Sequence, residues 1–418
     1  MSHVSENILN SKNNFSKAHN IRKKITHRKV LNFAENLIVP LLSILSISGN
    51  KLREISRIIL LSATSRISIN QAVKKVKKRS SASAIRYHLR KKQSESSLEE
   101  LEYKTNKILY KIAKTILHQK WVEFAIDFVC IPYHGKPLRN DNEIIRSHAK
   151  SGTTHFHAYT TLYMIILRMR FTLTVKYVRK NTPLIDVVEF MLKTIKKIGL
   201  RIKCIYFDKG FYSIPVVRLL KRRHVRAVIP APAKGDKHGI KSLFGYRKSK
   251  VVKYRMISII NKRKESENIK QAINCKYAKN KYGRKGTYYF AYVLICVNLK
   301  PKVCYEKYRK RFGIETSYRL MNAIRARTSS QSPNIRLIYI AVSLILQNAW
   351  VYINWSYMRE RKQGQRSVKN GITLHSFTDL IIEGIKSLMG TIKDTIVINI
   401  PKVNLLCLNT ITTYLGVI

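Results

Sequence analysis

Acidic residues are scarce in this chain of 418 residues. Asp and Glu total 23, whereas Lys and Arg total 80, so the formal net charge is +57. The basic excess runs from the N-terminus past residue 370 and is not confined to one tail. A chain this cationic needs a polyanionic partner. Charge alone would fit nucleic acid, a membrane surface or a ribosome, and nucleic acid is favoured because neutralising phosphates releases counterions.

Paired cysteines are missing as well. None of the six cysteines belongs to a CxxC pair, and several lie in apolar runs. This pattern excludes a cysteine zinc site and a disulfide framework, and it indicates buried free thiols in a reducing cytosol. The residues are Cys130, Cys204, Cys275, Cys296, Cys304 and Cys407.

A secretory signal is not visible, because residues 1–14 are polar and have no apolar core segment. One stretch, Leu337–Met358, carries no charge and is long enough to span a bilayer. It contains Gln347, Asn348 and Asn354, however, and no second span supports it. We therefore expect a helix buried in a large soluble core, and no membrane partner.

Hydrophobic residues make up 45% of the chain, which is enough for a substantial core. The length predicts two to four domains. We divide the chain into a basic flexible tail, a helical region, a first part of a mixed α/β core, a β-rich insertion, a second part of the core and a C-terminal region. The boundaries are 1–30, 31–118, 119–230, 231–300, 301–360 and 361–418.

Within the helical region, residues 68–92 predict two short helices with a tight polar junction. The first has a stripe of Ile69, Ala72, Val73 and Val76, and the second, capped by Ser80 or Ser81, carries Ile85, Leu89 and the basic residues Arg86 and Arg90. This pattern fits a helix-turn-helix whose second helix binds DNA. Two ordinary basic surface helices fit it equally well. We expect deletion of residues 1–118 to spare the fold of the core.

From Trp121 the periodicity changes to strands and helices in alternation, which predicts a mixed α/β core. Strands are expected at 121–132, about 155–167, about 171–178, 201–207 and 227–229, with helices near 184–195 and 213–220. A turn near residues 168–170 predicts a hairpin. Short β runs follow at 251–260, 271–278 and 287–298, and one helix is expected from about Val303 to Arg325.

Asp127 lies in the most apolar of these strands, WVEFAIDFVCIP. A carboxylate inside a buried strand is costly unless something pairs with it. A metal ion is the most economical partner in a chain with few acids. A hydrogen bond to neighbouring backbone, or a salt bridge to one of the many basic residues, is the alternative.

Two further acids could form one site together with Asp127. Asp208 ends the fourth core strand, and Glu315 lies on the helix after the insertion, where Tyr308, Arg311, Glu315, Arg319 and Asn322 form one narrow polar stripe. A solvated polar face would produce the same stripe. Cleavage of a phosphodiester builds negative charge, and two Mg²⁺ ions roughly 4 Å apart can stabilise both the attacking and the leaving oxygen.

These motifs together resemble the DDE transposases of prokaryotic insertion sequences, in the branch with a Y-R-E-K signature. The resemblance rests on Asp127 in the first strand, on DKGF at 208–211 and on Y-x2-R-x3-E at Tyr308, Arg311 and Glu315, and it covers roughly residues 121–350. It implies an RNase H-like core interrupted by a β-rich insertion before the glutamate helix. The chain would bind and cut double-stranded DNA at the element ends and join it to target DNA.

The resemblance also implies the roles of the site residues. Asp127, Asp208 and Glu315 would hold two Mg²⁺ ions, with Mn²⁺ as an alternative, and Tyr308 and Arg311 would contact phosphates near the cut. The protein would act as a homodimer on DNA, at the nucleoid in the cytoplasm.

One departure is visible. The lysine of the signature, seven positions after the glutamate, is Asn322 here, and Asn cannot neutralise a phosphate. Arg319 or Arg325 could substitute. A decayed copy that only binds DNA, a plain RNase H-like nuclease and a basic RNA-associated protein stay open as alternatives. Glu123 points to the same side of the predicted strand as Asp127 and is a rival metal ligand. For His155 and His157, structural or DNA-facing roles are favoured over metal binding.

Overall fold

The protein is described here by a computed structural model. The described residues are 24–47, 49–76, 80–91, 94–117, 121–166, 169–245, 247–260, 263–278, 286–309, 311, 313–362, 365–368, 371–388 and 397–399. Most of the expected tail at 1–30, and most of the C-terminal region after residue 388, lie outside them. The described end of that tail, Lys24–Thr26, forms the short strand β1, which pairs with β13 (Val397–Asn399).

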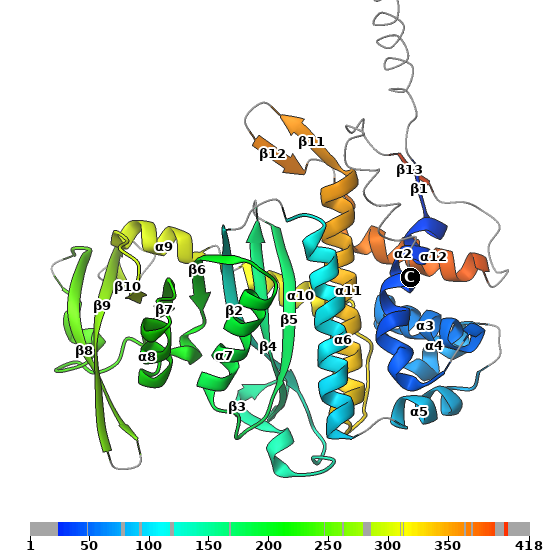
Figure 1. Ribbon diagram of the computed structural model, residues 1–418, viewed down its shortest axis with the longest axis horizontal. Helices are drawn as coiled ribbons and strands as arrows, with labels where there is room; N and C mark the ends of the chain where they lie inside the picture. Colours follow the sequence, from blue (N-terminus) through cyan, green and yellow to red (C-terminus); the bar gives the residue numbers. More distant parts are fainter. Residues whose placement is uncertain are drawn as a thin grey trace, which may run out of the picture.

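A nine-stranded mixed sheet forms the centre of the molecule (Figure 1). Its order is β3-β4-β2-β6-β7-β10-β9-β8, and β5 also pairs with β4. Strands β2, β6 and β7 are mutually parallel, and the other pairs are antiparallel. The bounds are β2 Trp121–Pro132, β3 Ile145–Lys150, β4 Thr153–Ile166, β5 Met169–Val178, β6 Arg201–Phe207, β7 Ala227–Pro230, β8 Lys250–Ile260, β9 Arg263–Tyr277 and β10 Thr287–Ile295.

The predicted strand at 121–132 and the predicted β4–β5 hairpin are confirmed. Strand β3 was not predicted, because five of its six residues are exposed and it has no apolar pattern. Strand β9 begins eight residues earlier than expected for the same reason, since its first half is the polar sequence RKESENIK. The insertion strands also extend the central sheet, because β10 pairs along β7.

Helices cover both faces of the sheet. Helices α7 (Leu184–Lys197) and α8 (Ile214–Arg222) pack on the face that carries Phe124 and Ile126. Helices α9 (Pro301–Arg309) and α10 (Gly313–Ala323) contribute to the cluster on the opposite face, around Ala125 and Tyr206. The predicted mixed sheet with flanking helices is confirmed. The short 3₁₀ helices are Ser43–Leu45, Asp141–Glu143, Lys209–Phe211 and Ile240–Leu243.

The N-terminal helices gather at the end of the molecule opposite the β8–β9 hairpin (Figure 1). They are α2 (His27–Leu42), α3 (Gly49–Thr64), α4 (Ile69–Lys75) and α5 (Ala82–Arg90), and α12 (Leu374–Leu388) packs against α2 and α3. The expected cap of the second short helix is present, since Ser81 Oγ accepts a hydrogen bond from the Ala84 backbone N–H at 3.1 Å. A separate hairpin joins β11 (Arg359–Lys362) and β12 (Gln365–Val368).

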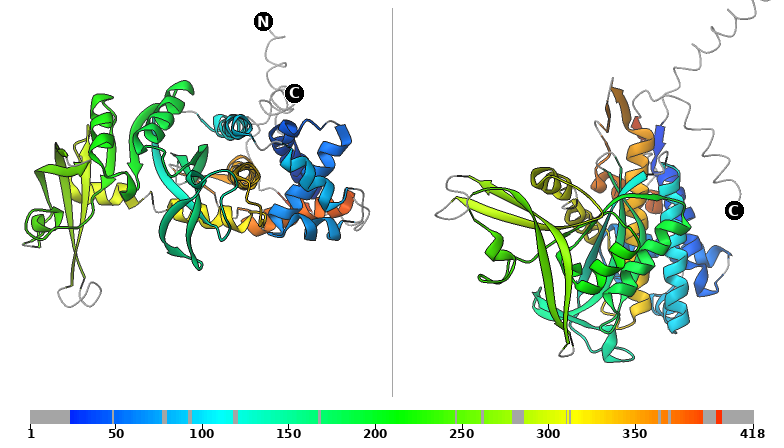
Figure 2. Two further views of the ribbon diagram at one scale, coloured as in Figure 1. Left: turned by 90° about the horizontal axis from the view of Figure 1, so that it is seen from below. Right: turned by 60° about the vertical axis from the view of Figure 1, so that its left-hand side comes forward.

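Two long helices, α6 (Glu95–Lys114) and α11 (Pro333–Tyr357), lie side by side against β5, as Figure 2 shows from a second direction. Leu101 and Leu109 of α6 are buried in the same hydrophobic cluster as the sheet. The structure therefore argues against our expectation that residues 1–118 can be removed without harming the core, because α6 is part of it.

Helix α11 is the one helix in the described part of the chain that is long and apolar enough to cross a membrane, and 89% of its apolar window is buried inside the protein. Its polar residues have internal partners. Gln347 donates to the Ser317 carbonyl at 3.1 Å, and Asn354 bonds to both backbone groups of Ile372. The prediction of a buried core helix at this position is confirmed.

Side chains from α6 and α11 also cap the outer edge of β5. Asn348 accepts from the Thr172 backbone N–H at 3.0 Å and donates to its carbonyl at 2.8 Å. Asn106 makes the same pair of bonds with Val175, and Glu102 accepts from the Tyr177 N–H at 2.6 Å. These side chains satisfy backbone groups that an edge strand would otherwise expose.

His157 on β4 is fully buried and hydrogen-bonded to the Tyr177 hydroxyl at 3.2 Å, which fits a structural role. Burial, and to a smaller extent the charge of Arg336, lower the pKa of His157 to about 3. Because the unfolded state binds a proton below about pH 6.5 and the folded state does not, stability falls as pH falls from 6.5 toward 3.

We therefore expect the free energy of unfolding to fall less between pH 7 and pH 5 in His157→Gln than in the wild type. The difference should be about 2 kcal/mol, and urea titrations at the two pH values would measure it. His155→Gln, two residues earlier and partly exposed, is the matched control. A His157→Gln profile as steep as the wild-type profile would contradict this account.

Candidate active site

Asp127 and Asp208 lie side by side on adjacent parallel strands. Strands β2 and β6 are in register from Phe124 to Ile126, and the Asp208 backbone N–H continues the ladder by donating to the Ile126 carbonyl at 3.2 Å. Asp127 is in mid-strand, since β2 runs on to Pro132, whereas Asp208 is the first residue after β6. The sequence-based hypothesis places Asp127, Asp208 and Glu315 at one edge of the sheet, and this geometry brings the two aspartates of that set together.

Local sequence explains why β6 stops at Asp208. Its Oδ2 atom accepts a hydrogen bond from the Gly210 backbone N–H at 3.3 Å, and its carbonyl accepts from the Phe211 N–H, so Asp208 starts a 3₁₀ turn. Phe211 then stacks on Phe128 of β2 with ring centroids 4.8 Å apart. This contact fixes the turn next to the strand that carries Asp127.

Arg311 bridges the two carboxylates. One guanidinium nitrogen lies 2.6 Å from Asp127 Oδ2, and the other lies 3.4 Å from Asp208 Oδ1. The Arg311 and Asp127 side chains are only 7% and 10% exposed, whereas that of Asp208 is 34% exposed. The salt bridge that we considered as the alternative partner of Asp127 is therefore present in this structure.

The helix expected from Val303 to Arg325 is broken, and this corrects the single polar stripe that we predicted. Helix α9 ends at Arg309 and α10 begins at Gly313, with Arg311 between them. Gly313 is a poor helix former, and the Arg170 guanidinium occupies the place where a Cβ atom would stand. The break lets Arg311 leave the helix surface and reach the buried carboxylates.

Tyr308, in the last turn of α9, is 3% exposed. Its hydroxyl donates to the Phe207 carbonyl at 3.1 Å, immediately before Asp208, and the Arg311 guanidinium lies 5.2 Å from the centre of its ring. In this structure Tyr308 thus binds the backbone next to Asp208, and Arg311 binds both aspartate side chains. The contact of Tyr308 and Arg311 with DNA phosphates stays a prediction.

The electrostatics of Asp127 reflect its position. The pKa of its carboxyl is raised to about 7, because burial and the charge of Asp208 raise it more than Arg311 lowers it. One guanidinium therefore does not fully compensate the cost of an ionised carboxylate at this depth.

Glu315 lies in the first turn of α10 and is exposed. One turn later, the Tyr318 hydroxyl is 2.6 Å from Thr161 Oγ1, and Thr161 is the cross-strand neighbour of Asp127 on β4. Helix α10 is thus anchored beside Asp127 through Tyr318. The other predicted contacts on this helix are Arg319, which is exposed, and Asn322, which lines a cavity together with Arg325.

The two aspartates fit a metal ion. Both are hard oxygen donors of the type that Mg²⁺ prefers, and a divalent cation would supply the positive charge that buried Asp127 requires. Among the described residues, however, no group of three or more His, Cys, Asp or Glu side chains is placed to hold a metal. A third ligand from Glu315 is therefore not part of the observed geometry.

The structure also places the other residues that the sequence singled out. Glu123, the rival ligand, accepts a hydrogen bond from the Tyr206 hydroxyl at 3.0 Å. In α5, Arg86 is half-buried and Arg90 is exposed. The five described cysteines are free thiols as expected, although Cys296 is exposed, and Cys407 lies outside the described residues.

Tyr318 and three of the arginines that line the cavity beside Asn322, namely Arg66, Arg327 and Arg336, were not predicted from the sequence. Arg336 left a signal, because it is the single charged residue in the apolar segment Pro333–Tyr357. Arg66 and Arg327 left no comparable signal, since each is one basic residue in a chain with many.

Comparison with known proteins shows the family to which the chain belongs. A transposase DDE domain family matches residues 119–348, which include Asp127, Asp208 and Glu315. A search of the curated proteins gives no significant match. Among solved structures, the piggyBac transposase synaptic complex with hairpin DNA is similar, with a TM-score of 0.52 at 10% sequence identity, over 87% of this chain and 80% of that chain.

At that identity the structural match shows a shared fold alone, and it supports the RNase H-like fold expected from the sequence. The family match is independent of it and spans more than half of the 418 residues. The chain therefore belongs to the family of proteins with a transposase DDE domain.

Proposed function

We propose that this protein is the transposase of a prokaryotic insertion sequence with a Y-R-E-K-type signature. It binds the terminal inverted repeats of its element, cleaves the DNA there and joins the freed end to target DNA. It works as a homodimer on DNA at the nucleoid in the cytoplasm. Membership of the transposase DDE family supports the general activity.

The observation that carries the proposal is the pair of aspartates beside each other on β2 and β6, bridged by Arg311. A purely structural carboxylate pair would have little reason to occur in a chain with 23 acids and 80 basic residues. A pair of hard ligands on two adjacent parallel strands is suited to metal-assisted chemistry on phosphates.

In this proposal Asp127 and Asp208 hold Mg²⁺, or Mn²⁺, and Glu315 completes the ligand set from α10. Bound metal ions supply an activated nucleophile and neutralise charge on the leaving oxygen. Arg311, which pairs with both carboxylates in this structure, would lie beside the bound ions and could contact a DNA phosphate there. Tyr308 keeps the end of β6 in place through its bond to the Phe207 carbonyl.

A direct test uses the DNA that flanks the gene. The purified protein and Mg²⁺ are incubated with a linear fragment that contains the gene and both flanks, and the cut sites are mapped by primer extension. Nicks at the borders of inverted repeats support the proposal. A catalytically decayed relic would bind these borders without cutting them, and a plain nuclease would cut without regard to them.

Recognition of the ends is assigned to α5. We expect Arg86→Gln combined with Arg90→Gln to weaken binding to an element-end duplex and to reduce the dependence of log K on log salt by about two, because each phosphate contact contributes about one. Fluorescence anisotropy over a salt series would measure both values.

The matched control for this pair is Lys196→Gln with Lys197→Gln, at the end of α7, which removes two charges far from α5. Equal affinity and salt dependence in the wild type and the α5 variant would remove α5 from the binding surface. Cleavage of the ends would still stand as a separate result.

A further inference from the structure

A cavity of about 530 Å³ lies where three segments of the chain meet. The segments are the end of β2 with its following loop, the stretch from the end of α10 to the start of α11, and the turn between α3 and α4. The lining contains Arg66, Arg325, Arg327 and Arg336 together with His134 and Asn322, and it contains no Asp or Glu. The cavity is thus a concentrated positive site between the catalytic sheet and the N-terminal helices.

Carboxylates of the described residues do not neutralise these arginines. Among the described residues, none of the four forms an ion pair with a carboxylate. Arg336 is 7% exposed, donates from Nε to the Ser330 carbonyl at 2.6 Å, and stacks over the Tyr133 ring at 4.5 Å. Burial lowers the pKa of Arg325, and the charges of Arg336 and Arg66 lower it further. Buried like charges are costly unless an anion compensates them.

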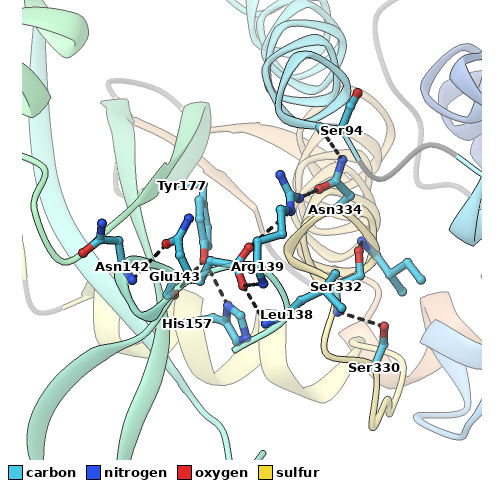
Figure 3. A network of polar contacts seen from close by, with 12 residues as sticks. Ser94, Leu138, Arg139, Asn142, Glu143, His157, Tyr177, Ser330, Ser332 and Asn334 are labelled. Atoms are coloured by element: carbon cyan, nitrogen blue, oxygen red, sulfur yellow. Dashed lines mark hydrogen bonds and ion pairs between the residues drawn. The ribbon is translucent and has the colours of Figure 1, made fainter. Parts of the chain in front are cut away.

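Polar contacts join the segments from which the cavity is built, and Figure 3 shows the network around Arg139 and Asn334. Arg139 donates to Asn334 Oδ1 at 2.7 Å and pairs with Glu143, and Asn334 donates to the Ser94 carbonyl at 3.1 Å. These bonds tie the loop after β2 to the first turn of α11 and to the start of α6. The Arg327 backbone N–H donates to the Ile67 carbonyl at 3.2 Å. This bond joins the stretch between α10 and α11 to the turn between α3 and α4. The site is therefore built before any ligand arrives.

The cavity lies close to the catalytic residues along two elements. Ile131 is four residues beyond Asp127 on β2, or about 13 Å at the rise of a strand. Asn322 is seven residues beyond Glu315 on α10, or about 10 Å. These spans correspond to about three or four base steps of 3.4 Å. A DNA strand cut at the aspartates would reach the cavity within a few nucleotides.

We propose that this cavity binds a backbone phosphate of the DNA strand that extends from the catalytic carboxylates toward the N-terminal helices. Guanidinium groups suit this ligand because they bind phosphate oxygens in a bidentate manner and stay charged. The positive end of α11, capped by Ser332, adds to the attraction. The anion-binding site itself is inferred from the four arginines. The identification of the anion as a DNA phosphate rests on the proposed function.

The test uses the full-length protein and the double variant Arg66→Gln/Arg327→Gln. Both side chains are exposed, so their loss should leave the fold intact. The control is Arg222→Gln/Arg223→Gln at the exposed end of α8, which removes the same charge elsewhere. An element-end duplex is titrated over a salt series, and thermal unfolding is followed with and without inorganic phosphate.

We expect the cavity variant to lose at least about tenfold in affinity and about two in the salt slope, while the control keeps the wild-type slope. Inorganic phosphate should raise the unfolding temperature of the wild type and not of the cavity variant. Equal slopes in the wild type and cavity variant would overturn the inference. Phosphate stabilisation lost with an unchanged DNA slope would show a site for free phosphate and overturn the DNA assignment. A wild-type chain that binds no duplex would refute the proposed function itself.

Discussion

Asp127→Asn is expected to abolish DNA cleavage while DNA binding and the fold are retained. The variant removes a negative ligand from the pair with Asp208 and keeps a side-chain oxygen that can accept the bond from Arg311. Loss of metal-assisted stabilisation worth about 4 kcal/mol corresponds to a drop of about a thousandfold in rate. Cleavage of an end-labelled element-end duplex, with anisotropy on the same duplex, measures the two properties separately.

Glu123→Gln is the control for this variant. It makes the same change of charge four residues earlier on the same strand, where Glu123 is bonded to Tyr206. We expect near wild-type cleavage from it. If Glu123→Gln abolished cleavage and Asp127→Asn did not, Glu123 would be the ligand and our assignment would be wrong.

Deletion of residues 1–118 is expected to prevent the remaining chain from folding. Five large apolar side chains of α6 are buried against the sheet and α11, at Leu98, Leu101, Ile108, Leu109 and Ile112. At about 2 kcal/mol each, they contribute about 10 kcal/mol, which is comparable with the whole stability of a typical domain. Expression followed by circular dichroism and a urea titration would show whether a cooperative transition survives.

A milder variant separates loss of α6 contacts from general damage. Asn106→Ala removes both hydrogen bonds to the backbone of Val175, and we expect it to destabilise the protein by about 2–4 kcal/mol. Asn70→Ala, on the exposed side of α4, is the control and should change stability little. A folded, cooperative 119–418 fragment would instead restore the separable N-terminal region that the sequence suggested.

The sequence was sufficient for the parts of the site that lie on regular apolar elements. Strand β2 was predicted with its observed ends because buried strands leave continuous apolar runs, and Asp127 was conspicuous within that run. Asp208 was found because a strand that ends at Asp-Lys-Gly is a local signal. Their adjacency depends on the parallel pairing of β2 with β6, which the structure shows and the sequence did not predict.

The sequence was insufficient where distant contacts decide the conformation. Near the break between α9 and α10, the Arg170 guanidinium fills the place of a Cβ atom at Gly313. Arg170 is more than 140 positions earlier in the chain, and a helical wheel cannot include such a contact. The position of α6 was also misjudged, since an amphipathic pattern shows that one face is buried and does not show what buries it. The arginine cavity was invisible because its members come from three separate segments.

The capped edge of β5 has a consequence for synthesis on the ribosome. Exposed strand edges are templates for aggregation while a chain is incomplete. Helix α6 is made before β5, so Asn106 and Glu102 can cover Val175 and Tyr177 as soon as the strand emerges. Asn348 follows Thr172 by 176 residues, so that part of the edge stays open until residue 348 has been translated. The nascent chain is thus most vulnerable near Thr172, and chaperone binding during translation should concentrate there.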